Sequence, residues 1–206
     1  MKSSGELKAH WEKIHSEKSR DVSWWQNPEE LWIEDFSELD LGKDSPIIDI
    51  GSGPSLLLKK LIELGFINLT ALDISSQALE RLKSNLGDLS AKVNFVHSDI
   101  LDFAGKDSIK VWHDRAVLHF LADPIDQARY SAVINSAVQS GGYALISTFA
   151  LDGPDSCSGL PVVRHDSQSI GKILGNEFEL MWEKPRIHRT PWESSQAFIT
   201  TLFKKK

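Results

Sequence analysis

Short apolar segments alternate with amphipathic helical patterns through the middle of this 206-residue chain. A short apolar run that ends at glycines or acids is typical of a buried parallel strand, and leucines at helical spacing indicate the helix that follows it. This alternation builds βαβ units and a parallel sheet. The expected strands are 46–50, 69–73, 92–97, 109–113 and 143–149, and the expected helices between them are 54–64, a helix that Ser75 or Ser76 caps and that reaches Leu86, and 123–138.

The pattern changes after Phe149. A loop over 152–161 carries glycines and prolines, and a short helix is expected at 167–174. Two extended runs, 178–184 (continuing toward His188) and 197–203, predict a terminal hairpin. The predicted fold class is therefore α/β, a Rossmann-like doubly wound, mostly parallel sheet with an antiparallel C-terminal hairpin.

The first 44 residues precede this alternation. A weakly patterned helix is expected over 7–18, and a second is expected from Pro28, because Leu31, Trp32 and Phe36 recur at helical spacing. The sequence shows no internal repeat and no clear domain boundary. We therefore expect a single domain over 1–206, with an N-terminal helical lid segment at 1–44 and a Rossmann-like core at 45–206.

Charge and cysteine content limit the classes of partner. The net charge is −6, and an acidic domain is a poor candidate for non-specific duplex binding; the terminal lysines 204–206 predict a solvated tail. No apolar run approaches the length of a membrane span, and the charged N-terminus does not resemble a secretory signal. Cys157 alone excludes an internal disulfide and a multi-cysteine metal site. We expect a cytoplasmic protein with a small-molecule or protein partner, no nucleic acid, no membrane and no metal.

The sharpest motif is Asp49-Ile50-Gly51-Ser52-Gly53-Pro54-Ser55, between an expected strand and helix. Glycines here let a ligand approach the backbone closely. The dinucleotide-binding fingerprint needs a third glycine where this chain has Leu56. The carboxylate of Asp49 would repel a pyrophosphate, but it can hold an ammonium group, directly or through water.

Two further acids follow the next two expected strands. Asp73, about 20 residues after the glycine turn, can accept hydrogen bonds from both hydroxyls of a ribose. Asp99, after Ser98, suits the exocyclic amine of an adenine, and the amide of Ile100 could meet a ring nitrogen. Carboxyl ends of adjacent parallel strands meet where ligands bind in such folds. A nucleoside with an amino-acid tail, such as S-adenosylmethionine, needs this set of partners.

These motifs resemble those of class I S-adenosylmethionine-dependent methyltransferases along nearly the whole chain. The glycine turn resembles the family's first motif, with Ser55 in place of the last glycine, Asp73-Ile74 resembles the ribose acid, Ser98-Asp99-Ile100 the adenine acid, and Gly141-Gly142 the turn before the fifth strand. The resemblance implies a seven-stranded sheet, S-adenosylmethionine as cofactor and S-adenosylhomocysteine as product. The residues that it implies at the cofactor are Asp49, Gly51, Ser52, Gly53, Asp73, Ile74, Ser98, Asp99, Ile100, Trp24 and Arg115.

More narrowly, the chain is similar to small bacterial methyltransferases remotely like citrate synthase lysine methyltransferase. The matching segments are His10-Trp11-Glu12, Val22-Ser23-Trp24-Trp25, the run from Trp112 to Leu121, and the run from Cys157 to Arg164. They mark a subgroup and do not name a substrate. Trp24 and Trp25 are candidates for a lid over the methionine end, where tryptophan faces favour a cationic sulfonium.

The acceptor side is predicted from position alone. His113, Asp114 and His119, at and after the fourth strand, are the catalytic candidates, because a base there could position or deprotonate an acceptor. His119 has a competing interpretation as a core histidine, and Arg115 could instead pair with Asp114 or Asp99. Arg164 and His165, after the fifth strand, are candidates for binding an anionic group.

The sequence leaves the acceptor open between a protein lysine and a small metabolite or soft nucleophile such as a thiol. A lysine must lose a proton, so Asp114 would matter to it, whereas a thiolate would not need that base. Two other functions are a dinucleotide-dependent oxidoreductase, which Leu56 and Asp49 disfavour, and a non-catalytic scaffold, which the presence of all three acids disfavours. Nothing in the sequence indicates the oligomeric state.

Overall fold

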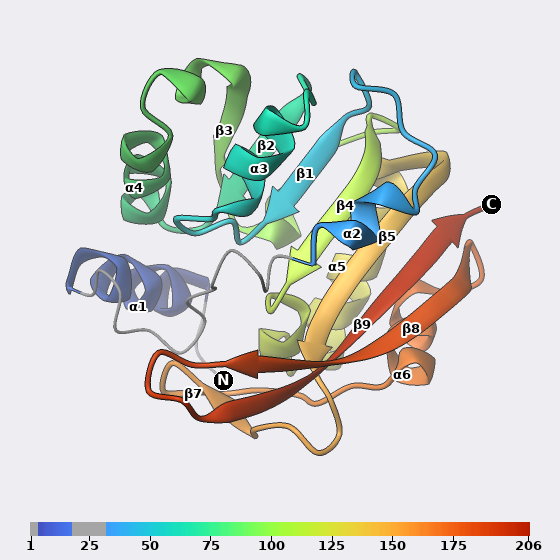
Figure 1. Ribbon diagram of the computed structural model, residues 1–206. Helices are drawn as coiled ribbons and strands as arrows, with labels where there is room; N and C mark the ends of the chain where they lie inside the picture. The colour runs from blue at the N-terminus through green and yellow to red at the C-terminus, as the bar shows by residue number, and fades with distance from the viewer. Residues whose placement is uncertain (1–3, 18–31) are drawn as a thin grey trace.

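The computed structural model describes residues 4–17 and 32–206, and a seven-stranded sheet runs through it in the order β3-β2-β1-β4-β5-β9-β8 (Figure 1). Strands β1 to β5 pair in parallel, and β9 pairs antiparallel with both β5 and β8. This arrangement confirms the predicted fold class. The strands are β1 Ile47–Ile50, β2 Leu69–Asp73, β3 Val93–His97, β4 Ile109–Arg115, β5 Val138–Phe149, β8 Phe178–Arg189 and β9 Ser195–Lys205.

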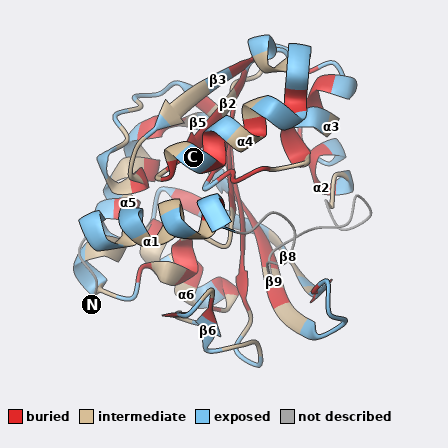
Figure 2. Ribbon diagram, turned by 90° about the vertical axis from the view of Figure 1, so that its left-hand side faces the viewer, coloured by how far each residue is buried: buried red, intermediate tan, exposed pale blue. Residues whose placement is uncertain are grey.

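Helices cover both faces of the sheet, and the side chains between the layers are buried (Figure 2). The helices are α1 Ser4–Glu17, α2 Glu34–Ser37, α3 Leu57–Glu63, α4 Ser76–Leu86, α5 Pro124–Ala137 and α6 Ser167–Leu174, with short 3-10 turns η2 Gly87–Lys92, η3 Ile100–Asp102 and η4 Leu118–Phe120. One core cluster joins α2, α3 and α4 to Ile47 and Val111; the other joins α5 and α6 to Ile48 and Trp112. Neighbouring residues of a strand thus point to opposite layers.

Several helix starts follow from local chemistry that the sequence shows. The Ser75 hydroxyl caps α4 by accepting the N–H of Ala78, and Asp123 caps α5 before a proline at its first turn. Helix α6 begins and ends as predicted. The terminal hairpin is also present, with both strands longer than expected, and the loop over 152–161 contains a small hairpin of β6 Ser156–Cys157 and β7 Leu160–Pro161.

Three predicted boundaries are wrong. Helix α3 begins at Leu57 rather than Pro54, because the glycine turn continues past Pro54. Strand β5 begins at Val138, directly after α5, so Gly141 lies within it, at φ +72° beside a register shift against β4. Trp32 has φ +47° and cannot belong to a helix; α2 follows at Glu34, and the predicted start at Pro28 lies outside the described residues.

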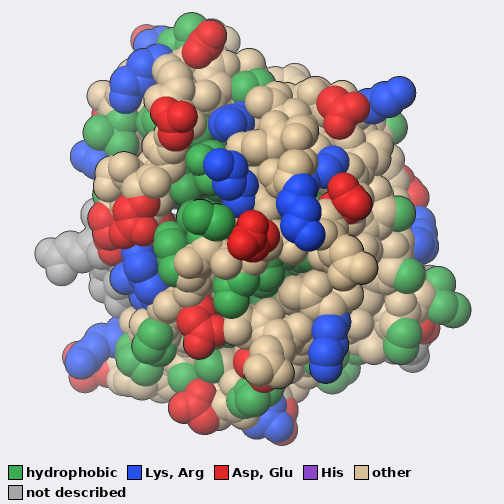
Figure 3. Space-filling view, turned by 90° about the vertical axis from the view of Figure 1, so that its right-hand side faces the viewer, with side chains coloured by type: hydrophobic (Ala, Val, Ile, Leu, Met, Phe, Trp, Pro, Cys, Tyr) green, Lys and Arg blue, Asp and Glu red, His purple; other side chains and the backbone are tan. Residues whose placement is uncertain are grey.

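The surface carries both signs of charge. Figure 3 shows Lys and Arg side chains interspersed with Asp and Glu over one face of the molecule. Within residues 4–17 and 32–206, no helix combines the length and apolar character needed to cross a membrane.

Candidate active site

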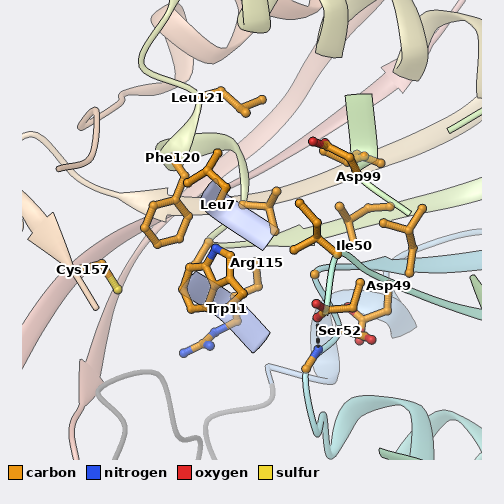
Figure 4. A pocket seen from close by; sticks show the side chains of 18 of the residues that line it. Leu7, Trp11, Asp49, Ile50, Ser52, Asp99, Arg115, Phe120, Leu121 and Cys157 are labelled. Atoms are coloured by element: carbon orange, nitrogen blue, oxygen red, sulfur yellow. Dashed lines mark hydrogen bonds between the residues drawn. The ribbon is translucent and has the colours of Figure 1, made fainter. Parts of the chain in front are cut away.

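A cavity of about 670 Å³ lies at the carboxyl ends of the parallel strands. Its wall comprises the turn after β1, the ends of β2 and β4, the segment after β3, helix α1 and the loop around Cys157 (Figure 4). This volume falls within the range of about 300–1,000 Å³ typical of small-molecule sites. The position matches the edge at which doubly wound sheets bind ligands.

The glycine turn brings backbone against this cavity. Gly51 has φ +59°, and a Cβ there would lie 2.3 Å from a methyl carbon of Val117, so a larger residue is excluded. Ser52 is fixed by its N–H, which donates to the carbonyl of Leu72 at 3.0 Å. Its hydroxyl oxygen is buried on the cavity wall without a hydrogen-bond partner among the described residues. An orphaned buried hydroxyl is the kind of group that a bound ligand satisfies.

Asp73 ends β2 under the turn. Its carboxylate accepts the N–H of Gly53 and the N–H of Ser75, both at 2.8 Å. Burial raises the pKa of Asp73 to about 6 against the lowering effect of these hydrogen bonds, and the charges of Asp49 and Glu12 add to the rise. Asp73 therefore carries its negative charge at neutral pH and loses it in mild acid.

Asp99 follows β3 and lines the cavity. One carboxylate oxygen caps η3 by accepting the N–H of Leu101 at 3.0 Å, and the other accepts the Ser4 hydroxyl of α1 at 2.6 Å. Ser98 and Ile100 beside it line the cavity, as does Ile74 after β2. The three acids predicted from the sequence, at positions 49, 73 and 99, therefore share one cavity wall.

Asp49 and His113 form a buried pair on adjacent strands. They are register partners in β1 and β4, and the Nδ1 atom of His113 lies 2.7 Å from a carboxylate oxygen of Asp49. The His113 ring packs against Phe36 of α2, which fixes its orientation. Both residues line the cavity beside the glycine turn, so the acid there has a partner that the sequence did not predict.

Helix α1 lies along the cavity and is hydrogen-bonded to the rest of the fold through Ser4, His10, Glu12 and Ser16. Besides the Ser4 contact, Glu12 accepts hydrogen bonds from the hydroxyls of Ser75 and Ser76 and from the N–H groups of Ser76 and Gln77. Leu7 and Trp11, between Ser4 and Glu12, and His15, one turn beyond Glu12, line the cavity. Burial lowers the pKa of His15 to about 4, so its ring is neutral at pH 7.

A family model described as a methyltransferase domain matches residues 41–188. This chain belongs to the methyltransferase domain family. The match confirms the class I methyltransferase identification. A comparison with curated proteins gave no match, and the narrower likeness to citrate synthase lysine methyltransferase stays a prediction.

Solved structures share the fold of this methyltransferase. A SAM-dependent methyltransferase from Anabaena variabilis superposes with a TM-score of 0.77 and 14% identity, over 100% of this chain and 96% of that one. The N-methyltransferase NodS from Bradyrhizobium japonicum, in complex with S-adenosylhomocysteine, superposes with a TM-score of 0.72 and 16% identity, over 95% of this chain and 98% of that one. A 1,6-didemethyltoxoflavin-N1-methyltransferase from Burkholderia thailandensis superposes with a TM-score of 0.68 and 17% identity, over 100% of this chain and 92% of that one.

The geometry of the methyltransferase gives Asp114 a structural position rather than the predicted catalytic one. Asp114 follows His113 in β4 and therefore points to the opposite layer, toward α5. It is fully buried, and its carboxylate accepts the Tyr130 hydroxyl at 2.7 Å and the N–H of Val117 at 2.9 Å. Asp114 is absent from the cavity wall, so we do not carry its role as a base forward.

His119 likewise lies in the core of the methyltransferase. Its ring is fully buried, with centroids 4.5 Å from Phe120 and 4.7 Å from Phe149. Neither ring nitrogen has a hydrogen-bond partner within the described residues, and burial lowers the pKa of His119 to about 3. The interpretation as a core histidine fits this position, and no catalytic role is carried forward.

Arg115, on the same face of β4 as His113, lines the cavity. Its guanidinium packs against the rings of Trp32 and Phe198. Of the two acids suggested as its partners, Asp114 accepts the Tyr130 hydroxyl and Asp99 accepts the Ser4 hydroxyl. Trp24 and Trp25 lie outside the described residues. Arg164 is exposed and His165 is buried beside Ser169, and neither lines the cavity.

Ser4, Trp11 and Glu12 of α1 were not among the residues predicted at the site. The segment His10-Trp11-Glu12 was singled out only as a mark of the subgroup, and Glu12 acts on α4, 63 to 65 residues away. No local pattern predicts such a contact.

Proposed function

We propose that this cavity binds S-adenosylmethionine and that the protein transfers its methyl group to an acceptor bound beside Arg115 and Trp11. The observation that carries the proposal is that Asp49, Asp73 and Asp99 line one cavity around the glycine turn. Three acids at these places match the ammonium, ribose and adenine amine of one ligand. A pyrophosphate would be repelled by the same set.

Each donor contact would use a different group of this chain. Asp73 would accept the ribose hydroxyls, and Asp99 the adenine amine, with the backbone of Ile100 beside it. Asp49, oriented by His113, would hold the ammonium group. Gly51, Ser52 and Gly53 would offer backbone close to the methionine portion, and the orphaned hydroxyl of Ser52 would gain a partner.

The bound donor supplies a methyl carbon that its positive sulfur already activates. The chain therefore has to align the acceptor and exclude water rather than generate a reactive group. Helix α1 supports that task, because Ser4, Leu7, Trp11 and His15 close one side of the cavity. The pair of Asp49 and His113 holds the ligand end nearest to the transferred group in a fixed place.

We further propose that the acceptor is a small molecule or a protein group, that nucleic acid and membranes are not partners, and that the protein acts in the cytoplasm. The acidic net charge of −6 supports the first exclusion. These proposals do not depend on the oligomeric state.

Calorimetric titration with S-adenosylhomocysteine tests the donor site. We expect wild-type protein to bind it and Asp73→Ala to lose at least tenfold in affinity, since hydrogen bonds to a charged group contribute about 1.5–3 kcal/mol. Asp88→Ala, an exposed aspartate in η2 away from the cavity, is the matched control and should bind as wild type does. Equal affinity in the Asp73 and Asp88 variants would remove Asp73 from the site.

A further inference from the structure

One side of the cavity is apolar and is left over by the contacts assigned to the donor. Figure 4 shows Asp49 and Asp99 on one side of the cavity and Phe120 and Cys157 on the other, with Trp11 between them. We call this second side the apolar compartment. Its wall is formed, among the described residues, by Trp11, Phe120, Cys157, Leu160 and Pro161.

The floor of the apolar compartment is a hydrophobic cluster of its own, distinct from the two clusters that fill the layers of the sheet. Phe149, Cys157 and Phe198 are buried in it, and Trp32 and Phe120 pack against them. Phe149 ends β5, and Phe120 belongs to η4, which follows β4. Because close-packed side chains hold one another in place, this apolar surface is formed before a ligand arrives.

Helix α1 and the small hairpin of β6 and β7 enclose the apolar compartment. Trp11 meets Phe120 edge to face, with ring centroids 5.2 Å apart. The Nε2 atom of His10 lies 3.0 Å from the carbonyl oxygen of Ser158, in the turn between β6 and β7. Three segments that are distant in the sequence therefore meet around one apolar space. This enclosure favours a small molecule over a protein surface.

Arg115 also lines the cavity, and its guanidinium packs against the same cluster. The central carbon of the guanidinium lies 5.8 Å from the centroid of the Trp32 ring and 5.4 Å from that of Phe198, and the Nε and Nη2 atoms are buried. The protein thus holds this side chain on its own rings. A ligand in the apolar compartment meets mainly ring faces and aliphatic carbon.

We propose that the methyl acceptor is an uncharged small molecule with an aromatic ring and that the apolar compartment binds this ring. The inference rests on the proposed function, because it assigns the remainder of a cavity whose other side holds the donor. Trp11 and Phe120 offer a ligand ring the faces and edges against which aromatic rings pack well. A charge carried into this surface would lose its hydration without a matching partner, which costs free energy.

The test compares three ligands that share a benzene ring and differ in charge, namely benzyl alcohol, benzoate and benzylamine. Their binding to the protein saturated with S-adenosylhomocysteine is measured by ligand-observed NMR titration at pH 7 and constant ionic strength. The neutral sulfur of this product adds no charge of its own. We expect benzyl alcohol to bind about tenfold more tightly than either charged ligand, because only the charged ligands have to be stripped of strongly held water.

Two variants test the rings that form the wall. Trp11→Ala and Phe120→Ala should each weaken the binding of benzyl alcohol about tenfold, because each removes apolar surface that the ligand would cover. Trp192→Ala removes an exposed tryptophan between β8 and β9 that is not part of the cavity wall, and it should behave as wild type does. Affinity for S-adenosylhomocysteine, measured on every variant, shows whether the donor site is intact. If Trp11→Ala also weakens that affinity, Phe120→Ala, which leaves α1 unchanged, decides.

No binding of benzyl alcohol, equal binding of the three ligands, or tighter binding of benzoate or benzylamine would overturn the proposal. Unchanged binding in the Phe120 variant, or the same loss in the Trp192 variant, would overturn it as well. Failure of the wild type to bind S-adenosylhomocysteine would instead overturn the proposed function, so the two failures are distinguishable.

Discussion

The carboxylate of Glu12 in α1 accepts the backbone N–H of Ser76 at 2.8 Å, at the first residue of α4. The same carboxylate accepts the N–H of Gln77, so a side chain from the N-terminal helix satisfies two donors that α4 itself leaves open. These hydrogen bonds lower the pKa of Glu12 to about 2 despite partial burial. The contact is therefore complete above the ordinary pKa of 4.5 and is lost as the pH falls through 2.

We expect Glu12→Ala to accelerate release of S-adenosylhomocysteine, because α1 forms one side of the cavity and a less firmly held α1 opens that side more often. Loss of a helix cap costs about 0.5–2 kcal/mol, which corresponds to release about twofold to thirtyfold faster. Stopped-flow fluorescence with an excess of competing ligand measures the rate. Glu17→Ala, an exposed glutamate at the end of the same helix, is the control. Equal rates for both variants would show that the contact does not limit release.

The raised pKa of Asp73 makes donor affinity depend on pH. Ribose hydroxyls donate to an ionised carboxylate better than to a protonated one. Since the pKa of Asp73 is about 6, affinity for S-adenosylhomocysteine should be constant above pH 7 and fall below pH 6, by up to about tenfold per pH unit. Calorimetry between pH 5 and 8 checks this, and Asp73→Asn should flatten the profile. A flat profile in wild type would contradict the role of Asp73.

Asp114→Asn should weaken the fold and leave the donor site intact. One carboxylate oxygen accepts the Tyr130 hydroxyl and the other accepts the N–H of Val117, so an amide, which has a single acceptor oxygen, cannot replace both contacts. We expect the free energy of unfolding to fall by about 1–3 kcal/mol in urea titrations. Affinity for S-adenosylhomocysteine should stay within threefold of wild type. An unchanged free energy of unfolding would refute the structural role.

His119 should destabilise the protein in acid. Its pKa in the folded state is about 3, below the ordinary 6.5, so the unfolded chain binds more protons between these values and stability rises with pH across that window. His119→Phe should therefore reduce the loss of unfolding free energy between pH 7 and pH 4.5 by about 2 kcal/mol. At pH 7 it should leave stability unchanged or raise it, because no buried nitrogen remains unsatisfied. An identical pH profile in both proteins would refute this account.

The donor end of the site was predictable because its signals are local. The glycine turn and the acids at positions 49, 73 and 99 each follow a strand, and parallel strands bring such positions to one edge of the sheet. The start of α3 was missed by three residues, because Pro54 is compatible with both a first helical turn and a loop.

The acceptor end was less predictable for a physical reason. Strand β4 is buried on both faces, so its sequence shows no alternation of polar and apolar residues to indicate which side chains face the cavity. His113 and Arg115 do so, whereas Asp114 faces α5. The contact of Glu12 with α4 depends on how α1 packs, and that is settled by tertiary structure alone.

Titration of the wild-type protein with S-adenosylhomocysteine and, separately, with NADH tests the central claim most directly. The account predicts saturable binding of S-adenosylhomocysteine at one site per chain and no binding of NADH under the same conditions. Binding of NADH without binding of S-adenosylhomocysteine would contradict it, because the three acids of the cavity would then accommodate a pyrophosphate.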